Sequence, residues 1–125
     1  MIKGLYETHV FVENIAVSIA KQAMLGLWEK PKQEIHKMHF AFRCDVNDVL
    51  YRSVSFLKAR NIKPYNFLND GSETTMVFAW MPAVAIYFED PDGHELEFIA
   101  VLDGVSRPEL GVLSFDEWEN RKEKY

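Results

Sequence analysis

Two acidic side chains lie in a segment that otherwise has the composition of a β-strand. The stretch YFEDPDGHELEFIA, residues 87–100, predicts a strand, a tight turn and a second strand. Because side chains alternate along a strand, Glu95 and Glu97 share one face with Ile99. Glu95 adjoins the turn and can reach water, whereas Glu97 lies in mid-strand, where a carboxylate without a partner is costly. A metal ion or a cationic side chain would offset that cost.

Two histidines occupy similar positions in two similar strands. His9 lies in ETHVFVE and His39 in KMHFAFR, in each case just before alternating aromatic or apolar residues, which is a weak internal repeat. Histidine is a common ligand of divalent metals, and such a site needs at least about three protein ligands. Each residue also has an ordinary interpretation, as a hydrogen-bonded histidine or as a glutamate paired with Lys or Arg. The residues alone leave both interpretations open.

The first third of the chain predicts strands and one short helix. Residues 5–13 favour a strand, and Asn14 is a plausible N-cap for a helix in IAVSIAKQA. One interpretation ends that helix at Gly26, with a short strand from residue 27. The other, which we favour, makes residues 24–28 a strand and limits the helix to about two turns.

The remainder predicts a complete β-α-β-β-β unit. A strand over 38–44 is followed by Asp45, the expected cap of a helix with apolar residues at helical spacing. It is followed by a strand over 62–68 weakened by Pro64, by an apolar stretch over 76–88 broken at Pro82, and by the turn 90–93 before the closing strand 94–102. In the tail, Ser114 and Glu117 have the spacing of a capping box.

Composition limits the function classes. The 125 residues suit one domain, with 48% hydrophobic and 26% charged residues. The net charge of −5 gives no support to a nucleic-acid role. Cys44, as the single cysteine, excludes an intrachain disulfide, and no signal peptide or membrane span is recognisable. We expect a cytoplasmic protein with no membrane or nucleic-acid partner.

These motifs resemble those of a known family. IYFEDPDGHELEF is similar to the closing motif of the vicinal oxygen chelate superfamily, which includes glyoxalase I, bleomycin resistance proteins and extradiol dioxygenases. THVFVENIAVSIA resembles the opening of that superfamily's first module, and HFAFRCDVNDV the opening of its second. The resemblance implies an α+β fold in which paired βαβββ modules form an incomplete barrel. It divides a single domain into a short first module (1–37), a complete second module (38–102) and a tail (103–125).

The resemblance also implies a metal site. The matching positions are His9 and His39, from the first strand of each module, and Glu97, from the last strand, with Glu95 as its solvent-facing neighbour. The cofactor would be a divalent ion, Ni, Zn, Mn or Fe, and Glu97 would have a catalytic role. A glyoxalase-like lyase or isomerase, a transferase or a dioxygenase would follow, acting on a small oxygen-rich molecule or a thiol conjugate. A homodimer is expected on the same basis.

Two departures from the family pattern qualify this expectation. Glyoxalase I adds a glutamate from the last strand of the first module, where Gly26 would fall here, with Glu29 beyond it. The three ligands His9, His39 and Glu97 would remain. Moreover, a full module needs about 50 residues, from four strands of about 5–6, a helix of about 11 and short loops. Only 30 positions separate His9 from His39, so the first module is cropped or a segment is absent from the sequence.

Several residues have alternative roles. Trp80, Met81 and Tyr87 are candidates for the wall of a substrate pocket, although core packing is the commoner role of such side chains. Cys44 is expected to be a packed thiol, and His36 and His94 surface residues. The alternative function is a metal-free small-molecule binding or resistance protein of bleomycin-resistance type.

Overall fold

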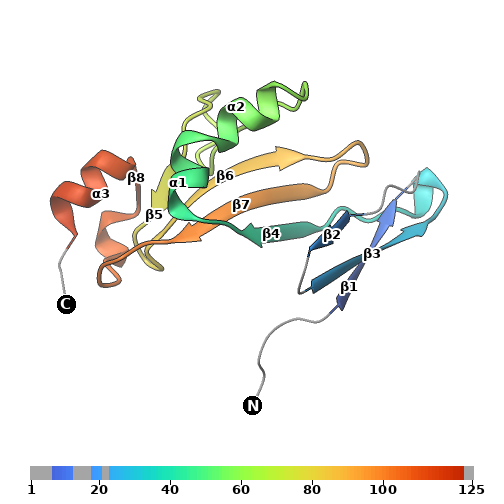
Figure 1. Ribbon diagram of the computed structural model, residues 1–125, viewed down its shortest axis with the longest axis horizontal. Helices are drawn as coiled ribbons and strands as arrows, with labels where there is room; N and C mark the ends of the chain where they lie inside the picture. The colour runs from blue at the N-terminus through green and yellow to red at the C-terminus, as the bar shows by residue number, and fades with distance from the viewer. Residues whose placement is uncertain (1–6, 13–17, 21–22, 123–125) are drawn as a thin grey trace, which may run out of the picture.

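The computed structural model describes residues 7–12, 18–20 and 23–122, which form two β-sheets (Figure 1). The smaller sheet contains β1 (Glu7–Val12), β2 (Ser18–Ala20) and β3 (Ala23–Glu29), in the order β1-β3-β2. The larger has the order β4-β7-β6-β5-β8 and is not closed into a barrel. The α+β fold with an incomplete barrel is thus as expected from the sequence.

The larger sheet contains the complete βαβββ unit. Its strands are β4 (His39–Arg43), β5 (Met76–Phe78), β6 (Ala83–Glu89) and β7 (Glu95–Val101). β4 and β7 are parallel although the chain between them spans the whole module, and β6 is antiparallel to β7. β8 (Val112–Leu113), which the sequence did not reveal, extends the sheet by pairing with β5.

The smaller sheet repeats part of this topology. β1 is parallel to β3, and β2 is antiparallel to β3, as β4 and β6 are to β7. Only residues 13–17 lie between β1 and β2, too few for a helix of about 11 residues and a further strand. The expected helix after Asn14 is wrong for residues 18–20, which form β2; Asn14 itself lies outside the described residues. The favoured strand over 24–28 is confirmed as β3.

The expected long helix is divided. α1 (Val46–Tyr51) and α2 (Ser53–Lys58) are separated by Arg52, whose φ of −122° departs from helical geometry. Asp45 occupies the N-cap position, but its side chain makes no capping hydrogen bond; its carbonyl accepts from the amides of Asp48 and Val49 instead. A short 3-10 turn (Lys32–Glu34) precedes β4, and another (Pro108–Leu110) precedes β8. The third α-helix of the described residues is α3 (Phe115–Arg121).

The predicted strand over 62–68 is reduced to one isolated bridge between Tyr65 and Tyr87. Pro64 has no N–H to donate to a ladder, and Asn66 is fully buried within a turn. The turn after β6 is as predicted: Gly93 has a φ of +80°, and its amide donates to the carbonyl of Asp90 at 3.0 Å.

The two faces of the larger sheet have different environments. α1 and α2 lie over one face, as Figure 1 shows, and pack on apolar side chains of β6 and β7, while Trp118 of α3 joins the same core. The opposite face carries a third cluster around Phe78, Ala85 and Tyr87, with Ile99 of β7 packed against it. The face of β7 with Glu95, Glu97 and Ile99 is therefore the one away from α1 and α2.

Candidate metal-binding site

Strand pairing places His39 beside Glu97. In the parallel ladder His39 is the partner of Glu95, and Glu97 is the partner of Ala41, so His39 and Glu97 are diagonal neighbours on one face. His39 Nε2 lies 2.9 Å from Glu97 Oε2, within hydrogen-bond distance. The two residues predicted as ligands from separate strands of the second module are therefore in contact.

The Glu97 carboxylate is buried although it is acidic. Its side chain is 4% exposed, against 48% for that of His39. Oε2 has His39 as its partner, but Oε1 is buried and has no hydrogen-bond partner among the described residues. Burial raises the pKa of Glu97, an effect that His39 and the Tyr87 hydroxyl partly oppose. A buried carboxylate oxygen without a partner is the type of atom that a cation would stabilise.

Two stacked tyrosines lie beside this pair. Tyr87 is the cross-strand partner of Glu97, and its ring centroid is 5.8 Å from that of His39. Tyr65 stacks on Tyr87 at 5.7 Å, and its hydroxyl donates to Glu95 Oε2 at 2.9 Å. Burial raises the pKa of both phenols, and the neighbouring carboxylates raise it further, so both remain neutral donors at physiological pH. Glu95 is thus half-buried and hydrogen-bonded, not the solvent-facing neighbour expected from the sequence.

The third predicted ligand stays a prediction. His9 belongs to β1, opposite Gly26 of β3, but its side chain lies outside what the structure describes. Among the described residues, no group of three or more His, Cys, Asp or Glu side chains is arranged to hold a metal. His39 and Glu97 supply two donors, and the unpaired Oε1 fits a cation, so a complete site needs at least one further ligand.

The register of the smaller sheet revises the expected fourth position. His9 pairs with Gly26 as His39 pairs with Glu95, so Trp28, two residues further, is the equivalent of Glu97. The sequence comparison had placed Gly26 there. Neither Gly26 nor Trp28 has a carboxylate, so this position still lacks the glutamate that would serve as a fourth ligand.

The three predicted pocket residues differ in exposure. Tyr87 is 7% exposed, whereas Trp80 and Met81, in the turn between β5 and β6, are 39% and 45% exposed. A cavity of about 800 Å³ lies elsewhere, between the segment 60–72 and the β6–β7 turn. Tyr65 and Glu95 line it, but His39 and Glu97 do not.

The other candidate side chains are structural. His94 is fully buried, contrary to the expected surface position, and its Nδ1 accepts from the amide of Met38 at 3.0 Å. The sequence around His94, which directly follows a glycine turn, gave no sign of this burial, because Met38 is distant in the sequence. Cys44 is half-buried with a raised pKa, mainly through burial, and so favours the unreactive thiol. His36 is exposed.

A sequence profile of the Glyoxalase/Bleomycin resistance protein/Dioxygenase superfamily matches residues 14–98. This span is more than half of the chain, and the protein therefore belongs to that superfamily. The matched span includes His39 and Glu97 but begins after His9. No curated protein is similar enough to the chain to count as a match.

Solved structures share the fold. The integron cassette protein HFX_CASS4, from the mobile metagenome of Halifax Harbour sewage outfall, is 25% identical, with a TM-score of 0.63 over 80% of this chain and 100% of that one. Oxidase ChaP-H2 is 16% identical, with a TM-score of 0.58 over 86% and 100% of the two chains. Oxidase ChaP-H1 is 14% identical, with a TM-score of 0.60 over 81% and 98%. At these last two identities the likeness concerns the fold alone.

Membership of this superfamily supports small-molecule binding, and many of its members depend on a metal. Within the described residues, no helix has the length and apolar character required to cross a bilayer. The metal, the substrate, the dimer and the cytoplasmic location stay predictions.

Proposed function

We propose that the protein is a metal-dependent enzyme of glyoxalase-like type, acting on a small oxygen-rich molecule or thiol conjugate. The observation that carries this proposal is the state of Glu97: a buried carboxylate, bonded to His39 through one oxygen and, among the described residues, without a hydrogen-bond partner at the other. A structural ion pair would ordinarily satisfy both oxygens of so buried a group.

His39 and Glu97 would hold a divalent ion, Ni, Zn, Mn or Fe, with His9 as the third ligand. Such an ion supplies Lewis acidity, which polarises neighbouring substrate oxygens. Among the described residues, Glu97 is a carboxylate placed to accept a proton, because it lies against His39 on the proposed metal-binding face. Tyr87, a neutral phenol, lies opposite Glu97 on the neighbouring strand.

The alternative is a metal-free binding or resistance protein of bleomycin-resistance type. It is supported by the superfamily match, whose description includes bleomycin resistance proteins. In that case His39 and Glu97 form a hydrogen-bonded pair that shapes the open face of the sheet. The burial of Glu97 Oε1 would then need another explanation.

The experiment that tests the proposal is the metal content of the purified, untagged protein by mass spectrometry. We expect about one divalent ion per site, lost in His39→Ala and Glu97→Gln and retained in His36→Ala, which removes an exposed histidine outside the site. The variant His9→Ala tests the third ligand: metal loss supports its role, and full retention removes His9 from the set. A wild-type protein that takes up no metal after reconstitution would overturn the proposal.

A further inference from the structure

The cavity beside the β6–β7 turn lies outside the proposed metal-binding site. Its volume is about 800 Å³, within the range of roughly 300–1,000 Å³ that is usual for small-molecule sites. Residues of the segment 60–72 line it on one side, and residues of the segment 88–96 line it on the other. His39 and Glu97 do not line it, so the proposed function leaves this cavity without a role.

The two sides of the cavity carry opposite charges. One side, which we call the basic wall, belongs to the segment 60–72 and contributes Arg60 and Lys63. The other, the acidic wall, belongs to β6, β7 and their turn and includes Glu89 and Glu95. Among the described residues, neither cation forms an ion pair with a carboxylate of the acidic wall. Opposite charges that line one cavity without pairing are available to a ligand of complementary charge.

The basic wall is held in place by the chain that follows α2. Arg60 donates to the carbonyl of Phe56 at 3.0 Å, and its guanidinium lies 3.6 Å from the centroid of the Phe56 ring. Two backbone hydrogen bonds, at 2.9 and 2.8 Å, join Tyr65 to Tyr87 of β6. Lys63 is exposed and lies between Arg60 and Tyr65 in the chain. The backbone that carries both cations is therefore fixed at its two ends, which lowers the cost of ordering them around a ligand.

The acidic wall is organised by the β6–β7 turn. Asp90, which also lines the cavity, uses its Oδ1 to accept from two backbone amides of the turn, at 3.0 and 2.8 Å. Glu95 Oε2 accepts from the Tyr65 hydroxyl at 2.9 Å, which fixes this carboxylate at the cavity. Glu89 is exposed at the end of β6. Glu89 and Glu95 are thus the two acids of this wall that a cationic group of a ligand can reach.

Apolar side chains complete the lining of the cavity. Phe88 is buried, and Ile62 and Leu96 pack with it in the cluster that contains Leu57. The cavity therefore combines an apolar surface with a group of cations and a group of acids. A small molecule that matches all three parts has an ammonium group, a carboxylate and an apolar side chain.

We propose that this cavity binds a zwitterionic small molecule of dipeptide size, with its ammonium group toward the acidic wall and its carboxylate toward the basic wall. Two extended residues separate their terminal charges by roughly 7 Å, so the two charges can face different walls. In a single amino acid the two charges are adjacent, which suits opposed walls less well. This ligand is distinct from the substrate proposed for the metal-binding face, and its binding needs no metal.

Three dipeptides that differ only at their ends test the proposal. They are leucylleucine, its N-acetyl derivative, which lacks the ammonium group, and its C-terminal amide, which lacks the carboxylate. Each would be titrated into the nitrogen-15-labelled full chain in EDTA and followed by NMR. We expect leucylleucine to bind with a dissociation constant on the order of 0.1–1 mM and to shift the amides of residues 61–72 and 88–96. Each blocked derivative should bind about fivefold more weakly.

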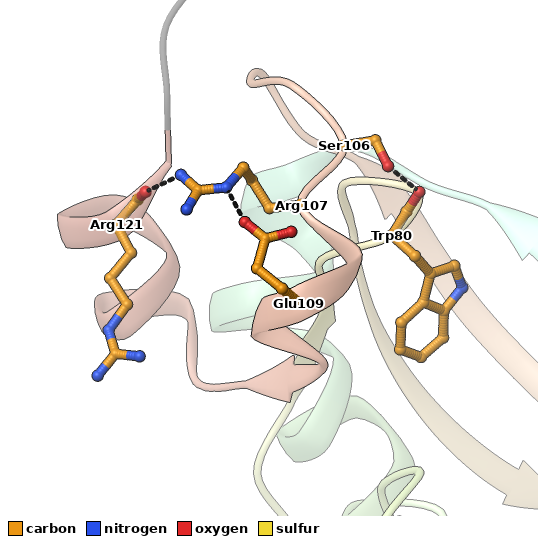
Figure 2. Close-up of polar contacts among 5 residues, drawn as sticks. All are labelled: Trp80, Ser106, Arg107, Glu109 and Arg121. Atoms are coloured by element: carbon orange, nitrogen blue, oxygen red, sulfur yellow. Dashed lines mark hydrogen bonds and ion pairs between the residues drawn. The ribbon is translucent and has the colours of Figure 1, made fainter.

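Substitutions in each wall should act on one end of the ligand only. Lys63→Met should weaken leucylleucine binding about fivefold and leave binding of the C-terminal amide within about twofold. Glu89→Gln should weaken leucylleucine binding by a similar factor and leave that of the N-acetyl derivative within about twofold. The matched control is Glu109→Gln, which removes an exposed carboxylate paired with Arg107 (Figure 2). Glu109 lies directly before β8, at the end of the larger sheet away from the β6–β7 turn (Figure 1), so its loss should change no affinity.

Equal affinities for the three dipeptides, or an equal loss in Glu109→Gln, would overturn the proposal. So would the absence of shifts at about ten times the expected dissociation constant. If the two walls instead bind each other in solution, Lys63→Met and Glu89→Gln would lower the melting temperature and leave leucylleucine affinity unchanged, which also overturns the proposal. Failure of the proposed function has a different signature: no metal uptake by the wild type, with the leucylleucine preference intact.

Discussion

His39 and Glu97, 58 positions apart in the sequence, are joined at 2.9 Å because β4 and β7 are parallel neighbours. The register matters as much as the pairing. A slip of one residue would turn Glu97 toward the apolar side chains beneath α1 and α2, where Phe98 and Ala100 now pack. The sheet thus decides which face the carboxylate occupies.

Replacing Glu97 with glutamine should stabilise the metal-free protein at neutral pH. Burial raises the folded-state pKa of Glu97 above its unfolded value. Its contribution to stability is therefore fully present below the unfolded pKa and is lost as pH rises through the folded pKa. In EDTA at pH 7 we expect the melting temperature of Glu97→Gln to be about 3–5 °C above that of the wild type. Near pH 4 we expect the two proteins to have the same melting temperature.

Thermal melts followed by circular dichroism from pH 4 to 8 provide the measurement. Glu95→Gln, on the same strand face, should keep the pH dependence of the wild type because Glu97 is still present. A Glu97→Gln protein whose melting temperature differs from wild type by the same amount at every pH would refute the assignment of a raised pKa.

Removing the Asn66 amide should destabilise the turn that presents Phe67. Asn66→Ala removes a fully buried side chain and leaves the part-buried amide of Leu68 without its partner. We expect a loss of about 2 kcal/mol in the free energy of unfolding, measured by urea denaturation. Asn47→Ala, an exposed position in α1, is the control and should stay within about 0.5 kcal/mol of wild type. Equal stability of the two variants would mean that the Asn66 hydrogen bonds contribute little.

The capping box of α3 is predicted to stabilise the folded protein. Ser114 Oγ accepts from the Glu117 amide at 3.2 Å, and Glu117 Oε2 accepts from the Ser114 amide at 3.1 Å. Ser114→Ala should cost about 1 kcal/mol, whereas Ser55→Ala on an exposed helix face should cost much less.

The bonds from Ser114 lower the pKa of Glu117. Its contribution is present above the unfolded pKa and is lost as pH falls through the folded value. The difference between wild type and Ser114→Ala should therefore narrow from pH 6 to pH 3 in urea titrations. A difference that stays constant with pH would assign the effect of the substitution to the hydroxyl alone.

His94 is predicted to be a structural histidine. It is fully buried, and its Nδ1 accepts from the Met38 amide directly before β4. His94→Ala removes that acceptor and leaves a cavity, so we expect a loss of about 2–4 kcal/mol without a specific loss of metal from folded protein. His36→Ala should be neutral in both respects. Metal loss from a folded His94→Ala protein, by mass spectrometry beside a thermal melt, would instead give His94 a role at the site.

Local sequence signals predicted much of the second module. The turn over 90–93, the break at Pro82 and the capping box at Ser114 each act over a few residues, and all are found in the structure. The helical spacing after Asp45 is also found, although Arg52 divides that helix into α1 and α2. Strand alternation also predicted that Glu95 and Glu97 share a face. These features follow from backbone geometry and nearest neighbours, which a sequence displays directly.

Features that depend on distant partners were decided by the tertiary structure. Residues 18–20 have a sequence suited to a helix, but they form β2 because β3 offers them an edge to pair with. The hydrogen bond to His94 comes from Met38, and that to Glu95 comes from Tyr65, both distant in the sequence. The sequence by itself determined which residue types could bind a metal and which strand face they share. Only the fold, by setting the β4–β7 register, placed His39 against Glu97 and buried Glu97 Oε1 where no other described residue bonds to it.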